Sequence, residues 1–151
     1  MKTRANLLAL LGTIAAMLLA LLQPVSGQNQ NKNNATYAEL AKAPEKARAK
    51  KNPLENDPEA VTAGRILFEQ HCAECHGETA EGSKKAPSLR APEVQNAEPG
   101  AIFWLLTNGV SRKGMPVWSK LPEPQRWQIV KFLKSLRTPA AKNSAAGPES
   151  F

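Results

Sequence analysis

The chain has 151 residues, which is enough for one small domain with extensions, and a formal charge of +7. Most of that excess lies in residues 1–56, because residues 57–137 hold eleven basic and nine acidic side chains. No basic stripe interleaved with aromatic residues is present, so the high pI does not indicate a nucleic-acid-binding protein, and none is expected as a partner.

The first 27 residues are predicted to be a signal peptide. Lys2 and Arg4 precede an uncharged, apolar run over residues 5–22, and the small residues ending at Gly27 suit cleavage after that glycine. An apolar run of this length is also just long enough to span a bilayer, so retention as a membrane anchor stays open. In both cases the rest of the chain is exported, and the predicted location is the periplasm, tethered to the inner membrane if residues 5–22 are retained.

Residues 28–56 are predicted to be a disordered linker. The stretch opens with Gln and Asn and continues with Ala, Lys and Glu, so it has little apolar surface with which to offset the entropy of ordering it. A transient helix over residues 37–51 is the alternative. The tail at residues 139–151 is predicted to be disordered as well.

Residues 57–138 are predicted to form the ordered domain, and its elements are helices. Helix starts are expected at Asp57, near Pro99 and near Pro122, where capping residues and prolines precede periodic apolar positions. The second helix is expected to stop at Gly109 and the last at Thr138. No alternating strand pattern is found, so the predicted fold class is all-α with long loops.

Both cysteines of the chain lie in one short segment, Cys72-Ala73-Glu74-Cys75-His76. This spacing is the c-type haem attachment motif. Two thiols three positions apart can each add across one vinyl group of a haem, and the histidine after them can donate an imidazole nitrogen to the iron. The segment therefore predicts one haem c, attached through Cys72 and Cys75, with His76 as an axial ligand.

Met115 is predicted to be the second axial ligand. Met1 and Met17 lie in the export segment, so Met115 is the only methionine left after processing. The only other histidine is His71, which directly precedes Cys72 on the tethered side and is expected to lie on the surface. A thioether ligand raises the reduction potential of a haem iron relative to a second imidazole.

Two further groups are expected near the haem. Trp118 follows the predicted ligand loop, and its indole is expected either to donate a hydrogen bond to a haem propionate or simply to pack against the core. Five basic residues lie in the loops expected around the haem edge: Lys84, Lys85, Arg112, Lys113 and Lys120. They can steer an acidic redox partner, or they can form an ordinary solvated surface.

From about residue 57 to residue 137 the sequence resembles the class I monohaem c-type cytochromes of bacteria. The matching features are Gly64-x-x-x-Phe68, Cys72-x-x-Cys75-His76-Gly77, Pro87, Asn108-Gly109, Gly114-Met115-Pro116 and residues 127–133. The resemblance implies the cytochrome c fold, in which three to five helices and long loops wrap around one covalently bound haem. It places Gly64 and Phe68 against Ile129 and Phe132 of the last helix. It also implies that the Pro87 carbonyl oxygen accepts a hydrogen bond from the imidazole of the haem-ligating histidine.

With both axial positions filled, the predicted function is electron transfer between respiratory or dehydrogenase partners, and not enzymatic catalysis. A haem subunit of a periplasmic oxidoreductase is the alternative. A haem enzyme or gas sensor would need an open distal position with acid–base groups beside it. No second histidine is available there, and Met115 is expected to close the site. A thioredoxin-like thiol module would need a βαβ pattern, and a zinc site would need a second pair of ligands; neither is seen.

Overall fold

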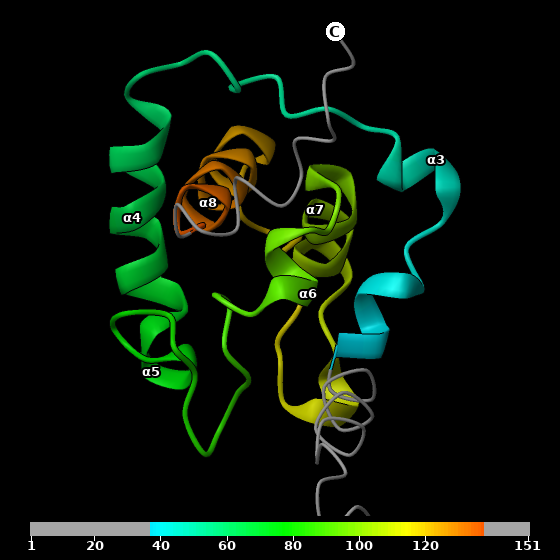
Figure 1. The fold of residues 1–151 in the computed structure, drawn as a ribbon, viewed down its shortest axis with the longest axis vertical. Helices are drawn as coiled ribbons and strands as arrows, with labels where there is room; N and C mark the ends of the chain where they lie inside the picture. The colour runs from blue at the N-terminus through cyan, green and yellow to red at the C-terminus, as the bar shows by residue number, and fades with distance from the viewer. Residues whose placement is uncertain (1–36, 138–151) are drawn as a thin grey trace, which may run out of the picture. The chain divides into compact units, whose positions relative to one another are not determined.

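The computed structural model describes residues 37–137, which are mostly helical (Figure 1). The helices are α3 (Glu45–Arg48), α4 (Ala60–His71), α5 (Ala73–His76), α6 (Pro92–Gln95), α7 (Pro99–Asn108) and α8 (Glu123–Ser135), with a 3₁₀ turn, η1, at Ser111–Lys113. Residues 37–41 are helical too. Over this part of the chain no named strand forms, and the only β-pairing is an isolated antiparallel bridge between Val110 and Met115. The predicted all-α fold with long loops is confirmed.

Two predictions concern residues beyond this range. The signal peptide or anchor at residues 1–27 and the tail at residues 139–151 both lie outside the described residues. Among residues 37–137, no helix combines the length and the apolar character that a membrane span requires.

Helices α4 and α8 cross closely, as the family resemblance implies; in Figure 1, α8 is seen nearly end-on beside the upright α4. The crossing point is Gly64, where an added Cβ would lie 2.0 Å from the backbone oxygen of Gln128 and 2.9 Å from the Cβ of Phe132. Phe68, one turn further along α4, is fully buried, and its ring centroid lies 5.3 Å from that of Phe132. Glycine is therefore required at residue 64 for the two backbones to approach.

The helix starts are predicted well for α7 and α8 and less well for α4. Pro99 is the first residue of α7, and Pro122 is the N-cap of α8. Asp57, however, is not the N-cap of α4, which begins at Ala60. Its carboxylate accepts a hydrogen bond from the Glu59 amide at 2.9 Å, closing a local turn ahead of the helix, as aspartate side chains commonly do.

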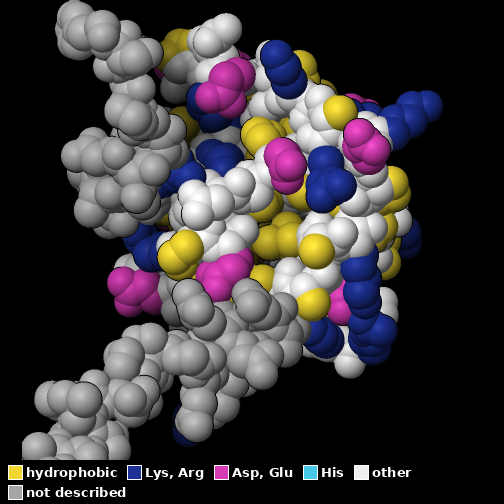
Figure 2. All heavy atoms as spheres, turned by 45° about the vertical axis from the view of Figure 1, so that its right-hand side comes forward, with side chains coloured by type: hydrophobic (Ala, Val, Ile, Leu, Met, Phe, Trp, Pro, Cys, Tyr) yellow, Lys and Arg dark blue, Asp and Glu magenta, His cyan; other side chains and the backbone are white. Residues whose placement is uncertain are grey.

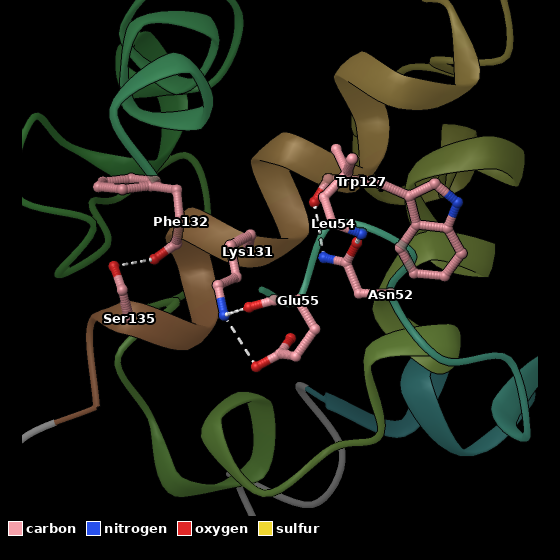
Figure 3. A network of polar contacts seen from close by, with 7 residues as sticks. All are labelled: Asn52, Leu54, Glu55, Trp127, Lys131, Phe132 and Ser135. Carbon is pink, nitrogen blue, oxygen red and sulfur yellow. Dashed lines mark hydrogen bonds and ion pairs between the residues drawn. The ribbon is translucent and has the colours of Figure 1, made fainter. Parts of the chain in front are cut away.

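Residues 37–56 pack against the domain, so the predicted boundary at residue 57 is wrong for them. Leu40 and Ala43 are buried, and α3 lies against α7, where a Cβ added at Gly100 would meet the Ala47 carbonyl oxygen at 2.1 Å. The Asn52 amide donates to the backbone oxygen of Trp127 in α8 at 2.9 Å (Figure 3). A few specific anchors thus order a segment whose composition is typical of a linker.

The surface carries both signs of charge. Figure 2 shows Lys and Arg side chains at several places on one face, with Asp and Glu among them and hydrophobic side chains exposed between. This mixture agrees with the near balance of charge over residues 57–137. It does not form a single basic patch on the face shown.

Candidate functional site

The Cys-x-x-Cys-His segment follows α4 directly. Cys72 is the C-cap of α4 and the N-cap of α5, and its carbonyl oxygen accepts hydrogen bonds from the amides of Cys75 at 3.1 Å and His76 at 2.9 Å. This single helical turn places positions three apart on one face. Both thiols and the imidazole consequently border the same space.

That space is a cavity of about 460 Å³. All six predicted site residues line it: Cys72, Cys75, His76, Pro87, Met115 and Trp118. Its walls are largely apolar and come from α7 and α8, through Ile102, Leu105, Leu106, Ile129 and Leu133. A mostly apolar cavity of this size, with a few polar groups and soft ligands at its edge, suits a large apolar cofactor.

His76 is oriented by the loop that follows it. Its Nδ1 atom lies 2.8 Å from the carbonyl oxygen of Pro87. A carbonyl oxygen only accepts, so Nδ1 carries the proton and Nε2 keeps its lone pair for a metal. Burial lowers the pKa of His76, and the Pro87 hydrogen bond opposes this in part. The imidazole is therefore neutral near pH 7, which is the form that binds iron.

The position of Pro87 depends on a close approach at Gly82. The Gly82 amide donates to the His76 carbonyl oxygen at 2.8 Å, and Gly82 has a φ of +87°. A Cβ added there would lie 2.6 Å from the Ser88 nitrogen and 2.9 Å from the Pro87 carbonyl carbon. Glycine at this residue lets the loop fold back until its carbonyl reaches the histidine.

The Cys72 thiol does not have the character of a redox-active cysteine. Burial, with a smaller effect of the neighbouring Cys75, raises the pKa of the Cys72 thiol to about 11. Thiol–disulfide exchange needs a thiolate, and reactive cysteines have a lowered pKa. A protonated, half-buried thiol beside a cavity fits the attachment of a cofactor better than disulfide exchange.

Met115 is presented by a tight loop after α7. The bridge between Val110 and Met115 is closed by two backbone hydrogen bonds, of 2.9 Å and 3.2 Å, around η1. Gly114, with φ +82°, provides the left-handed turn immediately before the methionine. The Trp118 amide donates to the Leu106 carbonyl oxygen at 3.0 Å, which fixes the far side of the loop to α7.

His71 is not the surface residue that the sequence suggests. It is half-buried, lines the cavity, and its ring centroid lies 5.2 Å from that of Trp118. The prediction considered only its place beside Cys72 and could not anticipate that the loop after Met115 returns to it. Trp118 thus packs against His71 at the edge of the cavity.

Three of the predicted basic residues, Lys85, Arg112 and Lys113, are engaged in ion pairs. The Lys85 ammonium lies 2.9 Å from the Glu74 carboxylate, and both groups line the cavity. Lys113 lies 3.9 Å from the carboxylate of Glu39, which also accepts from Arg112. The charge at this edge is therefore partly balanced.

Three cavity residues were missed because they precede residue 57: Tyr37, Glu39 and Leu40. The one local signal was Tyr37, the only tyrosine of the chain, placed ahead of an otherwise Ala- and Lys-rich stretch. Nothing in the sequence shows that this stretch returns to the cavity.

Comparison with known proteins agrees with this geometry. The model of the family described as "Cytochrome C oxidase, cbb3-type, subunit III" matches residues 59–133, which include both cysteines, His76 and Met115. Residues 59–133 are a cytochrome c domain. A cytochrome c domain is an electron-transfer module, and membership implies covalently bound haem c.

The related proteins are much longer than the matched region. The domain is 43% identical over 53 residues to the cbb3-type cytochrome c oxidase subunit CcoP of Rubrivivax gelatinosus, covering 35% of this chain and 16% of that protein. It is 31% identical over 77 residues to CcoP of Azospirillum brasilense, covering 46% of this chain and 25% of that protein. Among solved structures, cytochrome CL of Methylophaga aminisulfidivorans MPT superposes with a TM-score of 0.49 at 26% identity, over 67% of this chain and 77% of that one.

Proposed function

We propose that the cytochrome c domain holds one haem c, attached through Cys72 and Cys75 and ligated by His76 and Met115, and that it transfers single electrons. The observation that carries this proposal is one apolar cavity that both thiols, the imidazole and the thioether line. In the attachment each thiol would add across one vinyl group of the haem. The sulfur would bond to one vinyl carbon and the thiol hydrogen would go to the other, so no oxidant would be consumed.

The axial ligands have distinct tasks. His76, held by the Pro87 carbonyl oxygen at 2.8 Å, presents a neutral imidazole in a fixed orientation. Met115 supplies a soft thioether, which favours the reduced iron and raises the potential. Trp118 at the cavity edge is the candidate donor to a haem propionate, and its packing on His71 would hold the indole in place.

Electron transfer fits this ligand set better than catalysis. With His76 and Met115 both on the iron, no coordination position is left for a substrate or a gas. A bound haem supplies an iron that changes by one charge between two oxidation states. The protein contributes the apolar walls, which exclude water and limit the structural change that accompanies that step.

The partners are proposed to be redox proteins of the respiratory chain, met after export to the periplasm. Relatives named as oxidase subunits favour the alternative in which the domain works as a haem subunit of a larger oxidoreductase. Gel filtration of the periplasmic extract and of detergent-solubilised membranes, followed by haem staining, separates the two. A free carrier elutes at the size of a single chain, whose full-length mass of 16.4 kDa falls if the signal peptide is removed, whereas a subunit elutes with its complex.

The ligand assignment is tested by Met115→Ala, with Val117→Ala as the matched control two residues along the same loop; Val117 is 49% exposed. We expect the Met115 variant of the ferric holoprotein to lose the weak sulfur-to-iron absorption band and to have a lower midpoint potential. The Val117 variant should keep both. A band that survives in the Met115 variant would contradict the assignment, and the mass of the holoprotein would report the number of attached haems.

A further inference from the structure

A short segment ahead of the matched domain, residues 37–43, spans both loops that carry the proposed iron ligands. We call it the strap. It is anchored in the core by Leu40 and Ala43, which are 9% and 3% exposed. The family match begins at residue 59, so the strap lies outside the matched residues.

One end of the strap holds the loop on the histidine side. The Tyr37 hydroxyl donates to the carbonyl oxygen of Ser88 at 2.8 Å, and Ser88 directly follows Pro87, whose carbonyl orients His76. Burial, together with the nearby carboxylate of Glu93, raises the pKa of Tyr37. The hydroxyl therefore remains a protonated donor at neutral pH.

The strap also holds the loop on the methionine side, and Figure 1 shows the segment at residues 37–41 next to the turn η1. The Glu39 carboxylate, only 14% exposed, accepts a hydrogen bond from the Arg112 guanidinium and lies 3.1 Å from the Lys42 ammonium. Arg112 is two residues from Gly114, the turn that presents Met115. Hydrogen bonds from Arg112 and Lys42 lower the pKa of Glu39, so it is charged at neutral pH.

We propose that Glu39 is a positioning residue: through Arg112 it latches the ligand loop and limits how readily Met115 leaves the iron. The inference rests on the proposed ligation by Met115. Tyr37, Glu39 and Leu40 all line the cavity, so the strap borders the same space as Met115. The latch restrains the loop that carries Met115 and takes no direct part in electron transfer.

External imidazole measures this restraint in the ferric holoprotein, since it binds only when Met115 has left. Its apparent affinity is the intrinsic affinity multiplied by the fraction of open loop. A half-exposed ion pair usually contributes at most a factor of about five to such an equilibrium. We therefore expect Glu39→Gln to strengthen imidazole binding about two- to fivefold. The binding is measured by the loss of the sulfur-to-iron band as imidazole is added.

The matched control is Glu55→Gln, which removes the ion pair of Glu55 with Lys131 on α8 at 2.8 Å (Figure 3). Neither residue lines the cavity, so imidazole binding should equal that of wild type. Arg112→Gln should reproduce most of the effect of Glu39→Gln, which also loses the pairing with Lys113 at 3.9 Å. The double variant should add little to Glu39→Gln, because the Glu39–Arg112 pair is absent from both. Arg112→Gln also carries the test if the Glu39 variant folds poorly.

The outcomes separate the two proposals. If Met115→Ala removes the band but Glu39→Gln and Arg112→Gln bind imidazole as wild type does, the latch is overturned and the ligation stands. Fully additive effects of the two latch variants would overturn it as well. A band that persists in Met115→Ala would overturn the ligation and the latch together.

Discussion

One added carbon atom at Gly64 tests the crossing on which the fold depends. A Cβ there would lie 2.0 Å from the Gln128 oxygen, whereas ordinary contact begins at 3.4 Å. That oxygen belongs to the backbone and cannot rotate away, so α8 must withdraw by roughly 1.4 Å, the difference between these distances. Phe132 would move with it and lose contact with Phe68. We expect Gly64→Ala to lower the free energy of unfolding by about 1–3 kcal/mol, the usual range for an overpacked core.

The measurement is denaturant unfolding of the ferric holoprotein, followed by far-ultraviolet circular dichroism. Thr62→Ala is the control, since Thr62 is exposed on the same helix and this variant should unfold at or above the wild-type midpoint. In a helix without steric crowding, alanine is more stable than glycine by about 1 kcal/mol, so the effect of helix propensity opposes the steric effect. A Gly64→Ala protein as stable as wild type, or more stable, would refute the close approach of the two backbones.

Three further predictions concern the Pro87 loop, the Glu39 carboxylate and two exposed lysines. Gly82→Ala should displace the Pro87 carbonyl from the His76 imidazole and shift the midpoint potential in a redox titration. An unchanged potential would show that the Pro87 contact does not influence the potential. The pKa of Glu39 is lowered from 4.5, so the folded state takes up this proton at lower pH than the unfolded chain. Its contribution to stability is complete above that value and is lost as pH falls below it. Acid unfolding curves should show this dependence and Glu39→Gln should flatten it; parallel curves would argue against it. Lys84 and Lys120 are both exposed, and changing them to Glu should slow the reduction of an acidic partner in stopped-flow mixing at low salt. The difference from wild type should shrink as added salt shortens the screening length to about 8 Å. Equal rates at every salt concentration would show that both are ordinary surface lysines.

Local chemistry made much of the site predictable. The Cys-x-x-Cys-His spacing needs only one helical turn to bring Cys72, Cys75 and His76 to one cavity, and five residues carry that information. Pro99 and Pro122 mark helix starts because proline fits only the first turn. The resemblance also supplied the long-range pairing of Gly64 with α8, which no local pattern contains.

The N-terminal boundary failed for a different reason. Residues 37–56 are ordered by contacts with residues far away in sequence, such as Tyr37 with Ser88 and Asn52 with Trp127. Composition registers how much apolar surface a segment has, and here it is small. Composition does not reveal that Leu40 and Ala43 become buried when they pack against the domain. The short helices α5 and α6 were not predicted for a related reason, because four residues are too few to show the helical period of apolar positions.

The strap and the cavity are linked through the size of the core. A domain of about 100 residues has little apolar interior, and here α7, α8 and the strap face a cavity of about 460 Å³ instead of one another. With the proposed haem in that cavity, its two thioether bonds tie the macrocycle to the end of α4, and Met115 ties it to the loop after α7. The strap then joins the two ligand loops to each other through Tyr37 and Glu39. The same contacts that complete a thin core therefore also determine how firmly the second ligand is held, so stability and redox behaviour should change together in strap variants.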